Sequence, residues 1–407
     1  MSGTLFAQMV TFAFIPIITR LYTPAEFGLF SLFYSIANII GLISSWKYDQ
    51  AIMLPKSDRD AQALVFLSIC ITFAMTLFVT LGIAIFYNFL VDYFSGNVML
   101  IWLIPIGVLL VGLLQIFNAY SSRRQYYKQI ATVKAVNAVS VASIQTLSKY
   151  LFKLDGLVIG KLAADFLTLL QYLRIHIKRE SLQLRSISRR RMKVNALRHS
   201  NFPKYQSFTV FLNSLSQNLP VLLFASLYSP EVAGYYALTV RVLQVPVGLI
   251  GASTKEVYYQ RASRMHANNE NILELYKKTT LNLFRIFLIP MITLLMLGEY
   301  IFSWVFGSAW NVSGQIAQIL IVWFLFLFIN SPSMMTFSIL KLQKVQMKLE
   351  LFSIVMRFAS IYLGYLFFDS YMMAIVLFML SSVMVNVYAI HFIYSKLSHF
   401  KPTGVPV

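Results

Sequence analysis

The chain has 407 residues, of which 58% are hydrophobic and only 12% carry a charge, with a formal net charge of +19. Soluble domains carry about 25% charged residues, so this composition excludes a water-soluble globular protein. Long uncharged apolar runs recur from end to end and indicate a polytopic membrane protein. The single cysteine, Cys70, excludes an internal disulfide and has no partner for a thiolate metal site.

Hydropathy, charges and turn residues predict twelve transmembrane helices. Each is longer than the roughly 17 residues that a helix needs to cross the hydrocarbon, and no segment alternates like a strand of a membrane β-barrel. The predicted spans of the first half are 2–19, 27–46, 62–87, 97–120, 129–151 and 155–177. Those of the second half are 205–226, 232–253, 281–304, 314–340, 347–368 and 371–395. No basic segment of a cleavable signal precedes the first span.

Lysine and arginine are distributed unequally between the two sets of connections. With the N-terminus in the cytoplasm, the cytoplasmic connections hold 25 of these residues, whereas the opposite side has only Arg20, Lys149 and Lys153. Because positively charged loops stay in the cytoplasm, both termini are predicted to be cytoplasmic. The asymmetry also explains the basic net charge, so no nucleic-acid partner is needed to account for it. Anionic lipids of the inner leaflet are expected neighbours of these basic connections.

One eight-residue phrase occurs twice, as LYTPAEFG at 21–28 and LYSPEVAG at 227–234. Each copy has a hydroxyl residue and a proline that fit the cap and first turn of a helix. Each also has a glycine, Gly28 or Gly234, that allows close helix contact. Six spans, an even number, separate the copies, so the halves form a parallel repeat.

The predicted fold is an all-α membrane protein with two six-helix bundles related by this repeat. The predicted domains are an N-terminal bundle over 1–177, a basic cytoplasmic linker over 178–204 and a C-terminal bundle over 205–407. The linker is polar and contains nine lysines and arginines.

Several stretches are typical of one family. They are RLYTPAEFGLF, KYDQAIMLPKSDRDA, FPKYQ, NSLSQNLPVLLFASLYSPEVAGYYAL and VLQVPVGLIGASTKEVYYQRAS. In them the chain resembles bacterial oligosaccharide flippases of the lipopolysaccharide O-antigen type, within the multidrug, oligosaccharidyl-lipid and polysaccharide exporter superfamily. The resemblance covers nearly the whole chain and rests on helix-end and packing signals. It implies a central cavity, alternating access, the bacterial inner membrane and an undecaprenyl-diphosphate-linked oligosaccharide as substrate.

Charged residues inside the predicted spans are informative, because each costs roughly 2.5–3.5 kcal/mol on insertion scales. Arg174 lies near the interface and can snorkel, which leaves five cations and one anion: Arg241, Arg357, Lys134, Lys161, Arg285 and Asp165. This set favours an anionic passenger such as a lipid diphosphate. Guanidinium and ammonium groups can replace the water molecules that hydrate the diphosphate. The five cations are therefore predicted to bind substrate, and Asp165 is the candidate for ion coupling.

Each of these residues also has a structural interpretation. Lys161 and Asp165 are four positions apart on one helical face and can simply neutralise each other. Arg241 and Arg357 can satisfy helix-end carbonyls or polar neighbours, and Lys134 and Arg285 can snorkel to the cytoplasmic surface. Outside this set, Asp49 at the cytoplasmic end of the second span is expected to be solvated.

Uncharged polar residues form faces on two spans. Gln206, Thr209, Asn213 and Gln217 share one face of the seventh span, and Asn137 clusters with Lys134 on the fifth. Asn213, Gln217 and Asn137 are predicted to line a wet lumen that binds sugar hydroxyls. Hydrogen bonding between helices is the alternative.

The sequence carries no catalytic signature. It has no HxxxH pair and no glycine-rich phosphate loop, so we expect no enzyme activity, no cofactor, no metal and no direct use of ATP. Expected partners are the lipid-linked oligosaccharide, membrane lipids and polysaccharide polymerase or assembly proteins. Two alternatives stay open: an ion-coupled drug or organic-cation exporter of the same superfamily, and a non-transporting membrane component of polysaccharide assembly.

Overall fold

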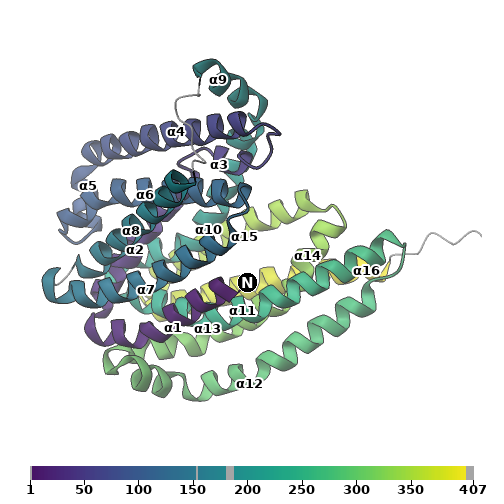
Figure 1. The fold of residues 1–407 in the computed structure, drawn as a ribbon. Helices are drawn as coiled ribbons and strands as arrows, with labels where there is room; N and C mark the ends of the chain where they lie inside the picture. The colour runs from purple at the N-terminus through teal and green to yellow at the C-terminus, as the bar shows by residue number, and fades with distance from the viewer. Residues whose placement is uncertain (1, 153–154, 180–187, 400–407) are drawn as a thin grey trace, which may run out of the picture. The chain divides into compact units, whose positions relative to one another are not determined.

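The computed structural model describes residues 2–152, 155–179 and 188–399, and every regular element in this part is a helix (Figure 1). The first half contains α1 (Ser2–Leu21), α2 (Pro24–Ile43), α3 (Tyr48–Ala51), α4 (Asp58–Ile85), α5 (Tyr87–Tyr93), α6 (Val98–Arg123), α7 (Tyr127–Phe152) and α8 (Gly156–Lys178). The second half contains α9 (Arg189–Arg198), the π-helix η3 (Phe202–Gln206), α10 (Ser207–Leu227), α11 (Pro230–Ala267), α12 (Leu273–Phe306), the 3-10 turn η4 (Ser308–Trp310), α13 (Asn311–Ile329), α14 (Ser331–Ile339), α15 (Gln343–Phe368) and α16 (Tyr371–Ser398).

The predicted all-α membrane fold is confirmed, and ten of the twelve predicted spans are found in the described part as apolar helices long enough to cross a membrane. Helix α1, whose apolar portion is Phe6–Leu21, and helix α11 occupy the positions of the other two predicted spans. The span predicted at 314–340 is divided, because α13 ends at Ile329 and α14 begins at Ser331 with a proline in its first turn.

Helices α11 and α12 extend beyond their predicted spans. The predictions end at residue 253 and begin at residue 281, whereas α11 continues to Ala267 and α12 begins at Leu273. Hydropathy detects only the part of a helix that lies in hydrocarbon, and Lys, Glu, Arg and Ala continue a helix readily in water. A core cluster that includes Tyr258, Tyr276 and Phe337 packs these extensions against α14 and α16.

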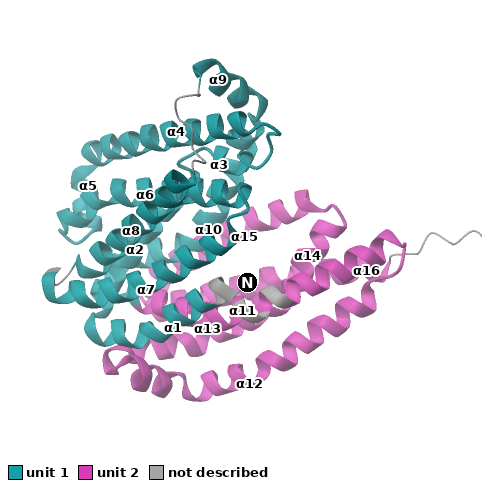
Figure 2. Cartoon of the chain, viewed as in Figure 1, with its two compact units in different colours: residues 1–234 teal, residues 235–407 magenta. Residues whose placement is uncertain are grey.

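The chain forms two compact units, residues 1–234 and 235–407 (Figure 2). The division falls after Gly234, and not in the linker 178–204, because α10 packs against α2. In unit 1, α7 packs against α1 and α8, and α6 packs against α2, α4 and α8. In unit 2, α13 packs against α12 and α16, and α15 packs against α16. The predicted boundaries at 177 and 205 concern a duplication and stay a prediction.

The repeated phrase starts a helix in both copies. Thr23 caps α2: its hydroxyl accepts from the Glu26 N–H at 3.3 Å, and its own N–H donates to a Glu26 carboxylate oxygen at 2.7 Å. In the second copy, the Ser229 hydroxyl accepts from the Val232 N–H at 3.2 Å at the start of α11. These are the predicted capping roles, and they satisfy amide groups that have no partner inside the helix.

The two copies of the phrase also contact each other within unit 1. A Cβ atom placed on Gly28 would lie 1.6 Å from the carbonyl oxygen of Pro230, and one on Gly234 would lie 2.0 Å from that of Pro24. The contact is therefore reciprocal, as a two-fold relation between the copies requires. Only glycine at both positions lets the backbones of α2 and α11 approach this closely.

Candidate functional site

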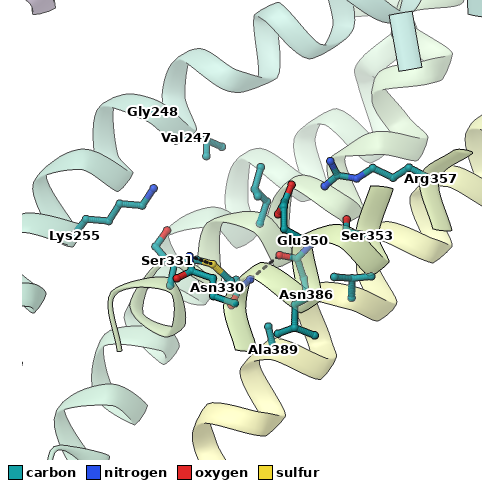
Figure 3. A pocket seen from close by; sticks show the side chains of 15 residues that line it. Val247, Gly248, Lys255, Asn330, Ser331, Glu350, Ser353, Arg357, Asn386 and Ala389 are labelled. Carbon is teal, nitrogen blue, oxygen red and sulfur yellow. Dashed lines mark hydrogen bonds between the residues drawn. The ribbon is translucent and has the colours of Figure 1, made fainter. Parts of the chain in front are cut away.

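Unit 2 contains a cavity of about 360 Å³ (Figure 3). Helices α11, α13, α14, α15 and α16 supply its walls. Among its lining residues are two cations, one carboxylate and several amides and hydroxyls: Lys255, Arg357, Glu350, Asn330, Asn386, Gln346, Ser331 and Ser353. Since polar groups inside a membrane bundle are costly, this concentration marks a candidate functional site.

The polar wall of the cavity is one face of α15. Gln346, Glu350, Ser353 and Arg357 are spaced four, three and four positions apart, so they follow each other up the same side of the helix. The predicted site included Arg357 but missed the other three. The i, i+4, i+7, i+11 pattern of polar residues in an otherwise apolar helix was a signal that would have found them.

Arg357 lies on α15 with its guanidinium directed toward the side of the cavity that holds Glu350 (Figure 3). The guanidinium carbon lies 5.9 Å from the centre of the Trp323 ring on α13, within cation–π distance. Glu350 and Tyr236 interact with it electrostatically. An arginine held in this way presents a planar, permanently charged fork that matches a phosphate or a carboxylate.

Two asparagines that line the cavity, Asn330 and Asn386, form a hydrogen bond with each other. The Asn330 amide donates to the Asn386 carbonyl oxygen at 2.8 Å, and the Asn386 amide donates to the Ser382 backbone oxygen at 2.7 Å. Asn330 is only 3% exposed, and its own carbonyl oxygen has no partner among the described residues. A buried acceptor of this kind is satisfied when a hydroxyl or water donates to it.

A second polar cluster lies in unit 1, between α7 and α8. Lys161 pairs with Asp165, with Nζ 2.5 and 2.6 Å from the two carboxylate oxygens. Asn137 on α7 donates to Asp165 at 3.2 Å and to the Thr168 hydroxyl at 2.7 Å. The Lys161 ammonium also lies 5.9 Å from the centre of the Tyr34 ring on α2. The structure therefore brings three of the predicted site residues, Lys161, Asp165 and Asn137, into direct contact.

The other predicted site residues are not part of either cluster. Lys134 on α7 and Arg285 on α12 have exposed side chains, and Arg241 on α11 is half-buried and has interactions of its own. Asn213 and Gln217 on α10 are exposed and hydrogen-bonded to each other. Their assignment to the substrate pathway stays a prediction.

A buried charge pair at the end of α2 was not expected. Lys47 and Asp49 have side chains only 4% and 6% exposed and pair at 3.3 Å. Asp49 also accepts from the Ser45 hydroxyl at 2.6 Å, and Lys47 donates to Gln115 on α6 at 3.1 Å. The expectation that Asp49 is solvated is therefore wrong, because α6 covers the turn after α2 and supplies its polar partners.

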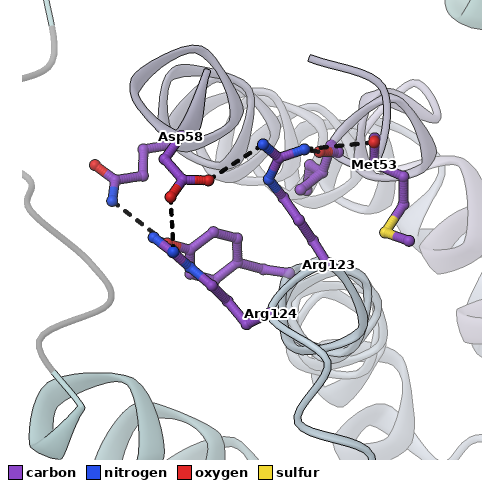
Figure 4. Close-up of polar contacts among 7 residues, drawn as sticks. Met53, Asp58, Arg123 and Arg124 are labelled. Carbon is purple, nitrogen blue, oxygen red and sulfur yellow. Dashed lines mark hydrogen bonds and ion pairs between the residues drawn. The ribbon is translucent and has the colours of Figure 1, made fainter. Parts of the chain in front are cut away.

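The start of α4 is clamped to the end of α6 by a more exposed network (Figure 4). Arg123 and Arg124 donate to the two oxygens of Asp58 at 3.2 and 2.8 Å. The Asp58 side chain is 56% exposed, so the pairs contribute little stability, as is usual at a surface. The described residues contain no group of His, Cys, Asp or Glu side chains that could hold a metal ion.

The described residues form a helical membrane protein with ten apolar helices long enough to span a membrane and two polar clusters. The chain is similar to an inward-facing MATE-family multidrug resistance transporter of the MOP superfamily, with a TM-score of 0.71 and 13% identity over 99% of this chain and 96% of that one. It is also similar to the lipid II flippase MurJ in an inward closed conformation, with a TM-score of 0.72 and 13% identity over 97% and 89% of the two chains. A MOP superfamily transporter from Pyrococcus furiosus, described by the reverse polarity of its binding pocket, matches with a TM-score of 0.61 and 13% identity over 98% and 95%.

The sequence itself identifies the family. Residues 17–315 match the model of the polysaccharide biosynthesis protein family, and the chain belongs to that family. No curated protein matches the chain in sequence. The expected resemblance to a polysaccharide biosynthesis family is thus confirmed, whereas the structural similarities, at this low identity, establish the fold.

Proposed function

We propose that this protein is a flippase that moves undecaprenyl-diphosphate-linked oligosaccharide units from the cytoplasmic to the outer leaflet of the bacterial inner membrane. The units would serve the assembly of O-antigen or a related surface polysaccharide. Membership of the polysaccharide biosynthesis family and the fold shared with MurJ, a lipid II flippase, support the proposal. Alternating access within a twelve-helix fold supplies the route.

The observation that carries the proposal is the composition of the unit 2 cavity. Arg357 offers a bidentate cation to a diphosphate, while the free acceptor of Asn330 fits a sugar hydroxyl. Both groups are attached to membrane-embedded helices that also carry Lys255 and two serines on the cavity wall. A charged head group with sugars attached needs both kinds of contact to replace its hydration during crossing.

Asp165 is the proposed coupling residue. It is a membrane-embedded carboxylate that forms an ion pair with Lys161 and accepts a hydrogen bond from the Asn137 amide. Intramembrane acids of this kind mark ion or proton pathways. Binding of a proton or sodium ion to Asp165 would release Lys161 from its pair and would compete with the hydrogen bond from Asn137, a contact between α7 and α8.

The second candidate function is export of an organic cation, and one observation favours it. Glu350 lies in the same cavity as Arg357, and a carboxylate is the group that attracts a cationic drug. The two functions therefore differ in which of the two charges contacts the passenger.

Transport in proteoliposomes tests the proposal. Purified protein is reconstituted with a fluorescent undecaprenyl-diphosphate oligosaccharide, and its movement between leaflets is measured by accessibility to a membrane-impermeant quencher. We expect Arg357→Ala to abolish most transport and Arg357→Lys to restore only part, because lysine lacks the planar fork. The matched control is Lys348→Ala, which removes an exposed charge from the same helix outside the cavity.

Deletion of the gene in its host supplies the second test. Lipid-linked repeat units should accumulate on the cytoplasmic face and return to normal when the intact gene is restored. Wild-type transport by Arg357→Ala, or export of a cationic dye that depends on Glu350 without any lipid flipping, would overturn the proposal in favour of the exporter.

A further inference from the structure

Helix α9 is a short basic helix held on the outside of unit 1. Its sequence, RRRMKVNALR, contains five cations and no acidic residue. The Ser188 hydroxyl caps it by accepting from the Arg191 N–H at 3.2 Å. It follows no apolar span pattern and does not belong to the transmembrane set.

The inner face of α9 is anchored to two other elements. Asn195, only 1% exposed, donates to Asp60 in the first turn of α4 at 3.2 Å. The Tyr48 hydroxyl on α3 donates to the backbone oxygen of Ala196 at 3.0 Å. Burial raises the pKa of Tyr48 above its ordinary value, so the hydroxyl keeps the proton that it donates. These contacts fix both the position and the rotation of α9.

The anchor places α9 at the depth where α4 enters the membrane. Asp60 immediately precedes the apolar part of α4, which begins at Ala61. Only 22% of the residues in the most apolar stretch of α4 are buried in the protein, so most of this stretch is available for contact with lipid. In Figure 1, α9 lies beside the α4 end that carries this first turn. A segment beside that turn is at the level of the lipid head groups.

The outer face of α9 carries an apolar pair flanked by cations. Val194 and Leu197 are 48% and 67% exposed and lie one turn apart on this face. Arg190, Lys193 and Arg198 are exposed around them. Apolar side chains bordered by lysine and arginine are the signature of a helix that lies in a membrane interface, where the chains enter the acyl boundary and the cations meet phosphates.

We propose that the outer face of α9, formed by Arg190, Lys193, Val194, Leu197 and Arg198, binds the phosphates of anionic phospholipids in the leaflet beside it. Charge complementarity and depth select this occupant. Each lysine or arginine close to an anionic membrane surface strengthens the interaction about fivefold. The contact holds the linker between the halves against the bilayer and is independent of the transported substrate.

A spin label measures the contact in the full-length protein. Leu197→Cys is made in a Cys70→Ala background, labelled with a nitroxide, and reconstituted into nanodiscs of phosphatidylcholine alone or of equal parts phosphatidylcholine and phosphatidylglycerol. Collision rates with oxygen and with a water-soluble nickel complex then report the depth of the label. We expect the anionic discs to lower nickel access severalfold relative to the neutral discs.

Charge variants separate lipid binding from simple shielding by the protein. Arg190→Gln with Lys193→Gln should remove most of the protection in anionic discs, whereas the matched pair Lys344→Gln with Lys348→Gln, exposed residues at the start of α15, should keep it. A circular dichroism spectrum and the elution volume show that each variant is folded. Equal nickel access in the two lipid compositions, which would leave this face open for a soluble partner, overturns the proposal. Protection that survives in the Arg190, Lys193 variant also overturns it.

Discussion

Gly28 and Gly234 lie in backbone contact, although 206 positions separate them in the sequence. A Cβ atom on either glycine would lie 3.0 Å from the amide nitrogen of the other, in addition to the shorter contacts with the proline carbonyls. The repeated phrase is therefore a packing motif. It begins two helices with a capped proline turn and lets them touch at the first turn.

The first prediction tests this contact. Gly28→Ala forces α2 and α11 apart, because backbone atoms of Pro230 cannot move aside as a flexible side chain would. We expect a loss of about 1–3 kcal/mol or more in stability, as is typical of overpacking. Thermal unfolding in detergent, followed by the remaining monodisperse fraction, measures it.

The control is Gly82→Ala on α4, where an added Cβ would meet nothing within 4 Å. Removing a helix-interior glycine there should be neutral or stabilise by about 0.5–1 kcal/mol. Equal melting temperatures for the two variants would show that the Gly28 contact does not limit stability.

The second prediction concerns the Lys161–Asp165 pair. If Asp165 couples transport to an ion gradient, Asp165→Asn should abolish transport driven by an imposed pH or sodium gradient, while downhill exchange continues. If the pair only neutralises charge, Asn leaves Lys161 without its partner and lowers abundance, and Lys161→Gln with Asp165→Asn restores both abundance and activity.

Transport per folded molecule distinguishes these outcomes. Glu274→Gln is the control. The Glu274 side chain is 85% exposed and pairs with Lys277 at the surface, so the protein should tolerate the change. Gradient-driven transport at the normal rate in the double variant eliminates Asp165 as the coupling site.

The third prediction uses Glu350 to identify the passenger's charge. Glu350→Gln removes the only carboxylate among the described lining residues of the unit 2 cavity. A diphosphate head group should then bind roughly tenfold more tightly, because repulsion is removed beside Arg357. Binding of a fluorescent lipid diphosphate in detergent measures the change.

If the protein transports cationic dyes, Glu350→Gln should abolish that transport. Weaker binding of the diphosphate after Glu350→Gln would mean that the carboxylate orients Arg357 instead of opposing the anion. Ser353→Ala, which changes a neutral neighbour on the same wall, controls for disturbance of α15.

The fourth prediction concerns the buried pair of Lys47 and Asp49. Lys47→Met should destabilise by about 3–5 kcal/mol, because it leaves the Asp49 carboxylate buried without its cation. Lys47→Met with Asp49→Leu should recover much of that loss, since apolar residues avoid the desolvation cost of a buried pair. Abundance and thermal stability measure both.

Lys56→Gln, an exposed cation a few residues further along, should change neither quantity. A single Lys47 variant as stable as the wild type would indicate that water reaches Asp49 once the lysine is gone.

The sequence determined the order and the approximate position of the apolar helices. Those properties depend on runs of apolar residues and on the placement of charges in loops, which are local features. The caps at Thr23 and Ser229 were equally readable, because a cap forms within four residues. The ion pair of Lys161 with Asp165 was anticipated for the same reason, since four positions bring two side chains together on any helix.

Only the tertiary structure decided which faces of those helices meet. Lipid tails are as apolar as the side chains of neighbouring helices, so an apolar sequence does not state whether a given face contacts lipid or protein. The packing of α15 turned the face that carries Glu350 and Arg357 toward a cavity, and the packing of α14 and α16 brought Asn330 to Asn386. Asp49 was predicted to be solvated at the end of the second span, but it is buried because α6 covers it. Such coverage depends on residues far away in the sequence, so no local pattern predicts it.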